Sequence, residues 1–262
     1  MPMHVEIAQA IAVVAHGSRW LAGDRAHPLE LEQRNSAFWQ VTRVEFVLDT
    51  PSASPVVAAS VGEWLRWVAD RGAERLWLFA EPPDRHPWGI LAALGGSQVL
   101  WSRTDGGPIE HDPDSELRGI RYADVQTTGH EIETPSLDVA CDGLREAVED
   151  AREFASEHQL DNWWPQRFAE ALALASSTDP SQPDYPDMMP ARGYTREARA
   201  LLATAAHAWV FGGMASWNDL PDDAADDPRY EPLSDRLYAR IWDAFLASVN
   251  SPILESFTPR SD

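Results

Sequence analysis

The C-terminal half of the chain begins with residues 136–157, which read SLDVACDGLREAVEDAREFASE. Apolar side chains recur every three or four positions from Leu137 to Ala155, and most of the Asp and Glu side chains fall on the opposite side. Because an α-helix turns once every 3.6 residues, this spacing collects the apolar side chains on one face. We therefore expect a long amphipathic helix with one face against a core and an acidic face in water.

Residues 134–262 carry helix signals almost throughout. A second helix is expected over 164–176 from its apolar spacing. Thr195 can cap a third helix, and Pro232 stands where the first turn of a last helix, reaching about residue 249, accepts proline. Four Pro residues exclude a helix from 178–190. We therefore predict a helical C-terminal region.

Residues 1–133 alternate strand and helix patterns. The segment 75–80 (RLWLFA) is apolar on both faces, as in a central strand that is covered on each side. Further strands are expected within 38–48, 98–102 and 119–125, and helices within 5–21 and 56–70. We predict an α+β fold: a small mixed sheet of about four strands with helices in the N-terminal half (1–133), and a helical C-terminal half (134–262), packed together as one unit.

The charge of the chain limits its partners. It carries 42 Asp and Glu residues against 21 basic residues, all of them Arg, so the formal net charge is −21. Such a field repels nucleic acid and anionic membranes and attracts cationic protein surfaces. We therefore expect a basic protein as partner, and neither nucleic acid nor a membrane. A role in solubility alone explains the acidity equally well, since many bacterial cytosolic proteins are acidic.

The carboxylates are clustered, which favours a binding role over solubility alone. One cluster holds five of them within nine residues: Asp219, Asp222, Asp223, Asp226 and Asp227. Another six lie on the expected helix between Asp142 and Glu157. We predict that the first cluster, helped by the second, forms an acidic partner-binding surface.

The segment 208–219 (AWVFGGMASWND) is the most distinctive local sequence, because two Trp residues flank a Gly pair. It has two interpretations. It can be a packed corner in which Ser216, Asn218 and Asp219 cap backbone groups. Alternatively, the aromatic side chains anchor a partner beside the acidic cluster. The second interpretation gives these candidate binding residues: Trp209, Phe211, Met214, Trp217, Asn218, Asp219, Asp222, Asp223, Asp226 and Asp227.

This segment, together with residues 230–238 (YEPLSDRLY), resembles uncharacterised bacterial proteins of the immunity type, which are encoded beside polymorphic toxins. The resemblance covers roughly the last third of the chain, and its FGGMxSWND-like motif has no catalytic role to transfer. It implies a cytosolic, non-enzymatic protein that neutralises a cognate toxin by binding it, often through an acidic surface that covers a basic active site.

Several kinds of catalysis lack the residues they need. Without Lys, Schiff-base chemistry and pyridoxal phosphate attachment are excluded, and residues 89–96 cannot form a P-loop. Cys141 is the only cysteine, which excludes an intramolecular disulfide and a multi-Cys zinc site. We therefore predict no cofactor and no metal.

Two other functions stay open. The eight histidines show no HxxxH or HExxH spacing, but an enzyme of unrecognised family can draw a His and carboxylate site from the loops around His86, His111 and His130. A structural homodimer through a Trp-rich face is the other alternative, since the chain holds 12 Trp residues.

The sequence also gives an expectation for localisation. Residues 7–15 form an apolar run interrupted only by Gln9, but no Arg precedes them, so they do not match a signal peptide. No segment approaches the roughly 18 consecutive apolar residues that a membrane span requires. We expect a soluble cytoplasmic protein.

Overall fold

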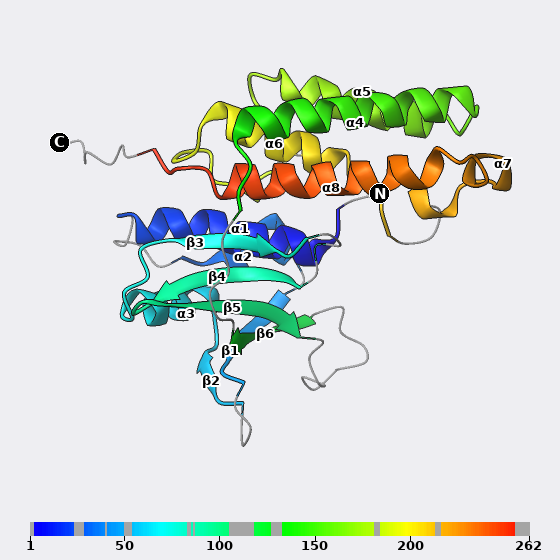
Figure 1. Cartoon of the computed structure of the whole chain (residues 1–262). Coiled ribbons are helices and arrows are strands. Elements are labelled where there is room, and N and C mark those ends of the chain that lie inside the picture. The colour runs from blue at the N-terminus through cyan, green and yellow to red at the C-terminus, as the bar shows by residue number, and fades with distance from the viewer. Residues whose placement is uncertain are drawn as a thin grey trace.

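The computed structural model describes residues 3–23, 29–39, 41–49, 54–82, 85, 87–104, 118–126, 133–180, 184–212 and 216–254. It contains a six-stranded sheet next to a layer of long helices (Figure 1). The strands are β1 (Val41–Val47), β2 (Val56–Ala58), β3 (Leu76–Ala80), β4 (Trp88–Leu94), β5 (Ser97–Thr104) and β6 (Arg118–Gln126). Their order is β2-β1-β6-β5-β4-β3, and β1 and β6 form the parallel pair in an otherwise antiparallel sheet.

The helices divide between the two halves as the sequence predicts, which confirms the α+β class. The N-terminal half holds α1 (Val5–Leu21), α2 (Leu31–Arg34), the short 3₁₀ helix η1 (Ser36–Phe38) and α3 (Val61–Ala69). The C-terminal half holds α4 (Leu137–Glu157), α5 (Trp163–Ala175), α6 (Arg196–His207), the 3₁₀ helix η2 (Trp217–Asp219), α7 (Asp222–Ala225) and α8 (Tyr230–Val249). No helix among the described residues has both the length and the apolar character to cross a bilayer.

Two strands depart from the expectation. Residues 56–58 form β2 and not the start of a helix, because the Ser60 hydroxyl accepts a hydrogen bond from the Glu63 N–H and so caps α3 at Val61. Strand β4 occupies a Gly- and Ala-rich segment with little β-branched content, where propensity gives no strand signal. Both strands form through pairing with partners in the sheet.

Aromatic side chains fill the face of the sheet that α1 and α3 cover. Phe46 of β1 stacks between Trp64 of α3, at 4.4 Å between ring centroids, and Tyr122 of β6, at 5.1 Å. Trp101 of β5 meets Phe46 and Trp64 edge-on. These four rings are fully buried and belong to one hydrophobic core that continues into the helices of the C-terminal half.

Side chains from two helices protect the free edge of β3. The Ser18 hydroxyl of α1 accepts from the Leu76 N–H and donates to the Leu76 carbonyl, each at 3.0 Å. The Asn250 amide, just after α8, accepts from the Leu78 N–H at 2.8 Å and donates to the Leu78 carbonyl at 2.9 Å. The backbone groups of Leu76 and Leu78 that face the free edge are thereby satisfied, and α8 is fixed alongside the sheet (Figure 1).

The helical layer is held by its apolar faces and by caps at the helix ends. Helix α8 packs against α4, α6 and β3, and α5 packs against α4 and α6. Ser136 and Thr195 cap α4 and α6 by accepting from the N–H groups of Val139 and Ala198. The Arg75 guanidinium donates to the carbonyls of Asn250 and Ser251 at the C-terminal end of α8, where the helix dipole favours a cation.

Candidate partner-binding surface

The two acidic segments of the sequence meet at one end of the helical layer. Helix α4 ends there, α8 begins there, and α7 lies beside the start of α8 (Figure 1). Two contacts join segments about 70 residues apart: His158 Nε2 lies 3.0 Å from Asp227 Oδ2, and Arg229 Nη1 donates to Glu157 Oε2 at 2.8 Å. We call this region, residues 153–161 and 219–229, the acidic end.

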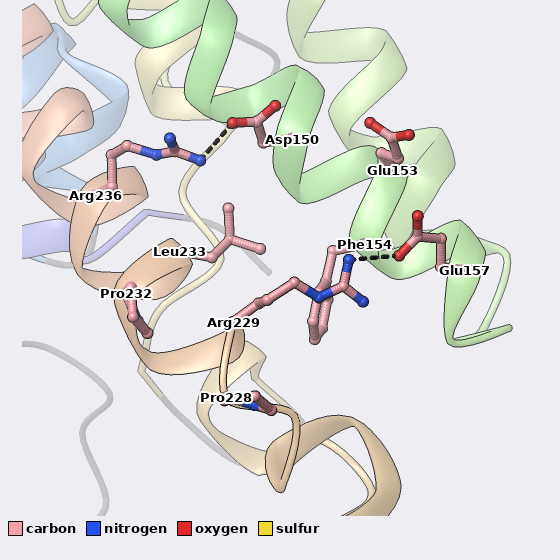
Figure 2. A pocket seen from close by; sticks show the side chains of 9 residues that line it. All are labelled: Asp150, Glu153, Phe154, Glu157, Pro228, Arg229, Pro232, Leu233 and Arg236. Carbon is pink, nitrogen blue, oxygen red and sulfur yellow. Dashed lines mark hydrogen bonds and ion pairs between the residues drawn. The ribbon is translucent and has the colours of Figure 1, made fainter.

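A groove of about 670 Å³ runs between α4 and α8 at the acidic end (Figure 2). Its apolar lining comes from Phe154, Pro228, Pro232 and Leu233, and its charged lining from Asp150, Glu153, Glu157, Arg229 and Arg236. Phe154 and Leu233 are buried, whereas Glu153 is exposed at the rim. The groove therefore combines an apolar floor with ionised walls.

Arg229 is the centre of the charge network in this groove. Its guanidinium donates to Glu157 and, at 2.9 Å, to Asp227 Oδ2, while its carbon lies 5.6 Å from the centroid of the Phe154 ring. These hydrogen bonds raise the pKa of Arg229, with Asp227 as the larger cause and Glu157 as the smaller. The guanidinium is thus held by two carboxylates beside an aromatic ring.

The carboxylate of Asp227 accepts hydrogen bonds from several donors. It accepts from the side chain of Arg229, from the Arg229 N–H at 2.8 Å, and from His158 Nε2, which must carry the proton because a carboxylate only accepts. The Arg229 side chain is the main cause that lowers the pKa of Asp227, followed by the backbone N–H. Asp227 is therefore ionised and held in one orientation, with its side chain 15% exposed.

A second ion pair lies further along the groove. Arg236 of α8 pairs with Asp150 of α4, and both side chains are about 40% exposed. Exposed pairs of this kind contribute only about 0.2–1 kcal/mol to folding, because water and salt screen them. The pair leaves the middle of the groove, between Arg229 and Arg236, lined by Leu233 and Pro232 (Figure 2).

The carboxylates predicted for binding fall into two groups. Asp219 accepts from the Ser216 N–H in a capping box, and Asp227 is held by Arg229 and His158, so both have structural tasks. The other three, Asp222, Asp223 and Asp226, are exposed on or just after α7, and none forms an ion pair with another described residue. Asn218 is exposed beside them.

The aromatic residues predicted as anchors are buried. Trp209, Phe211 and Trp217 are 2%, 8% and 0% exposed, so the structure assigns their rings to the core and not to a surface that a partner reaches. The fourth, Met214, lies outside the described residues. The reason is local packing: Trp217 lies against Phe154, Trp164 and Phe168, and its Nε1 donates to Ser234 Oγ at 2.8 Å.

The chain was also compared with known proteins. No family model, no curated protein and no solved structure matches it. The charges and contacts of the acidic end are therefore the basis for a function.

The structure bears only partly on the alternative functions. His86, His111 and His130, around which an enzyme site was expected, lie outside the described residues. Among the residues that are described, no cluster of His, Cys, Asp or Glu is arranged to hold a metal ion. Burial raises the pKa of the Cys141 thiol, which disfavours the reactive thiolate.

Burial also accounts for most of the tryptophan content. All 12 Trp residues lie within the described ranges, and two of them, Trp39 and Trp163, are exposed by more than a third. Trp39 follows η1 in the N-terminal half, whereas Trp163 opens α5 in the helical layer. The two exposed Trp rings therefore belong to different halves of the chain.

Sequence reasoning missed the cations of the groove. It selected the carboxylates from their density but left out Arg229 and Arg236, which pair with them across the groove. One signal was present: Arg229 follows Asp226-Asp227-Pro228, so a basic residue ends the acidic run. Its contacts with Glu157 and Phe154 depend on the packing of α4 against α8, which the sequence does not show.

Proposed function

We propose that this protein is a non-enzymatic binding protein of the immunity type, which neutralises a basic toxin or another cationic protein by binding it through the acidic end. It would act in the cytoplasm. The observation that carries the proposal is the convergence of the two acidic segments on one end of the helical layer. Exposed carboxylates on α7 and a groove with an apolar floor lie side by side there.

The physical support is complementarity of charge. Carboxylates at the rim of an interface raise the rate of association with a cationic surface, and apolar contacts in a groove slow dissociation. Asp222, Asp223 and Asp226 are free of ion pairs with the described residues, so their charge is available to a partner. The segments that resemble immunity proteins, 208–219 and 230–238, contribute η2 and the first turns of α8 to this region.

The proposal is tested by co-expression with the product of the adjacent gene and by measuring binding at two salt concentrations. We expect a complex whose dissociation constant rises steeply between about 0.05 M and about 0.5 M NaCl, because the Debye length shortens from more than 10 Å to less than 5 Å. A complex that is absent, or that salt leaves unchanged, would falsify the proposal.

A charge variant locates the surface. Changing Asp222, Asp223 and Asp226 together to Asn should weaken the complex about tenfold, since three exposed charges at about 0.5 kcal/mol each sum to roughly 1.5 kcal/mol.

The matched control neutralises three exposed carboxylates of the N-terminal half, with Asp70→Asn, Glu74→Gln and Glu81→Gln. It makes the same change in net charge and should alter the affinity less than about twofold. Equal losses in the two triple variants would mean that net charge acts without a defined surface.

A further inference from the structure

The side chain of Arg229 occupies an arginine-binding site made by its own protein. Glu157 and Asp227 each accept from it, and the Phe154 ring lies beside its guanidinium (Figure 2). A planar guanidinium presents several donors in a fixed fork and packs on aromatic rings, whereas a lysine ammonium is a compact point charge. The geometry of these three groups therefore suits arginine better than lysine.

Two of the three groups of the site are held by contacts that do not involve the guanidinium of Arg229. Asp227 accepts from His158 and from the backbone N–H of Arg229, so two of its hydrogen bonds are independent of the guanidinium. The Phe154 ring packs against the rings of Trp217 and Tyr230. The Arg229 side chain itself is 57% exposed, and it can turn into water without opening the core.

The groove is also larger than its internal occupant. Its volume of about 670 Å³ continues from Arg229 past Leu233 to the Asp150–Arg236 pair. Leu233 and Phe154 give the floor an apolar character, and Glu153 adds an exposed carboxylate at the rim. An arginine that enters from a partner would find its aliphatic stem covered and its head group paired.

We propose that Arg229 holds, in the free protein, the place that an arginine of the cationic partner takes in the complex, so that the groove selects arginine over lysine and Arg229 acts as a displaceable internal competitor. This inference rests on the proposed function and specifies the partner: an arginine-presenting basic surface. The inference predicts that removing the Arg229 side chain raises the affinity for an arginine-presenting partner. The reason is that the partner's arginine binds only during the fraction of time in which Arg229 leaves the site free.

The experiment uses the full chain and two fluorescent peptides of equal charge, one of five Arg-Gly repeats and one of five Lys-Gly repeats. Wild-type protein should bind the arginine peptide more tightly than the lysine peptide. Arg229→Gln should tighten binding of the arginine peptide about tenfold, which corresponds to a site that Arg229 fills about nine-tenths of the time. The lysine peptide should gain about threefold or less from the same substitution, through charge alone.

Arg236→Gln is the matched control, because it removes the same charge from the same groove but leaves Arg229 beside Phe154. It should raise the affinity for both peptides alike and leave the arginine-to-lysine ratio unchanged. The resonance of the Arg229 Nε–H group should also shift as the arginine peptide is added to wild-type protein, which reports displacement directly. Thermal melts of each variant confirm that the fold is intact.

Three outcomes overturn the inference. They are equal affinity for the two peptides, equal gains for both peptides from Arg229→Gln, and no binding of either peptide to any variant. The first two leave the proposed function standing as general charge attraction. The proposed function is judged separately, by the α7 variant and the whole partner protein, so the two failures are distinguishable.

Discussion

Replacement of Asn250 by Ala tests how the helical layer is attached to the sheet. The Asn250 amide satisfies both backbone groups of Leu78, which is fully buried in the edge strand β3. Removing it deletes these two hydrogen bonds, each worth about 1 kcal/mol, together with a longer one from Asn250 Nδ2 to Thr134 Oγ1 at 3.3 Å. It also leaves a buried N–H and a buried carbonyl of Leu78 without a partner, at about 1–3 kcal/mol each when water does not reach them. With partial access of water at this edge, we expect the free energy of unfolding to fall by about 3 kcal/mol.

Urea unfolding followed by tryptophan fluorescence measures this loss. With a slope of about 3 kcal/mol/M for a chain of this size, the midpoint should move down by about 1 M. Asn250→Asp is the sharper variant, because it keeps the volume and the acceptor for the Leu78 N–H but turns an oxygen toward the Leu78 carbonyl. It should destabilise the fold at least as much as Ala at neutral pH.

The control is Ser251→Ala, one residue further along. Ser251 is also buried, but its hydroxyl donates to the Ser248 carbonyl within the end of α8 and does not touch the sheet. Its loss should cost no more than about 1 kcal/mol. If Asn250→Ala costs as little as Ser251→Ala, the Leu78 groups do not depend on Asn250 and the reasoning about the edge is refuted.

Two further predictions concern pH. Burial raises the pKa values of Tyr122 and Tyr194 above their ordinary value, so near pH 10 the unfolded chain loses protons that the folded protein keeps. The free energy of unfolding, measured with urea, should therefore be constant below about pH 10 and should fall above it by about 1.4 kcal/mol per pH unit for each tyrosine. A free energy of unfolding that does not change above about pH 10 would contradict this. Hydrogen bonds from Arg229 lower the pKa of Asp227, so this carboxylate stabilises the fold above about pH 4 and loses that effect as the pH falls further; Asp227→Asn should lower Tm at about pH 6 and give a shallower acid decline, whereas parallel Tm profiles for variant and wild type would argue against the network.

The long helices could be predicted because their signals are local. Thr195 caps α6 as expected, and the apolar spacing from Leu137 to Ala155 gives nearly the whole of α4. These signals need no knowledge of the rest of the chain, since capping and periodicity act within a few turns. The strands are different: β4 has weak propensity of its own, and its position follows from pairing with β3 and β5.

In the candidate site, too, the sequence predicted what depends on local composition and missed what depends on contacts. Carboxylate density identified Asp222, Asp223 and Asp226, which are exposed, but could not separate them from Asp219 and Asp227, whose oxygens are engaged within the protein. What separates the two groups is whether the carboxylate oxygens accept hydrogen bonds within the protein, from residues near in the sequence or far from it. Asp227 is fixed by its neighbour Arg229 and by His158 of the segment after α4, and the second contact depends on tertiary packing.

The buried aromatic corner connects the fold to the proposed role. Trp217 lies beneath the groove, with its ring centroid 6.0 Å from that of Phe154, and Tyr230 at the start of α8 donates to the Trp217 carbonyl. These contacts fix the distance between the end of α4 and the start of α8, and so the positions of Glu157 and Asp227. A surface whose charged groups are held in place before binding loses less conformational entropy when a partner arrives. The aromatic residues therefore serve binding from inside the core, by holding the carboxylates where a guanidinium fits between them.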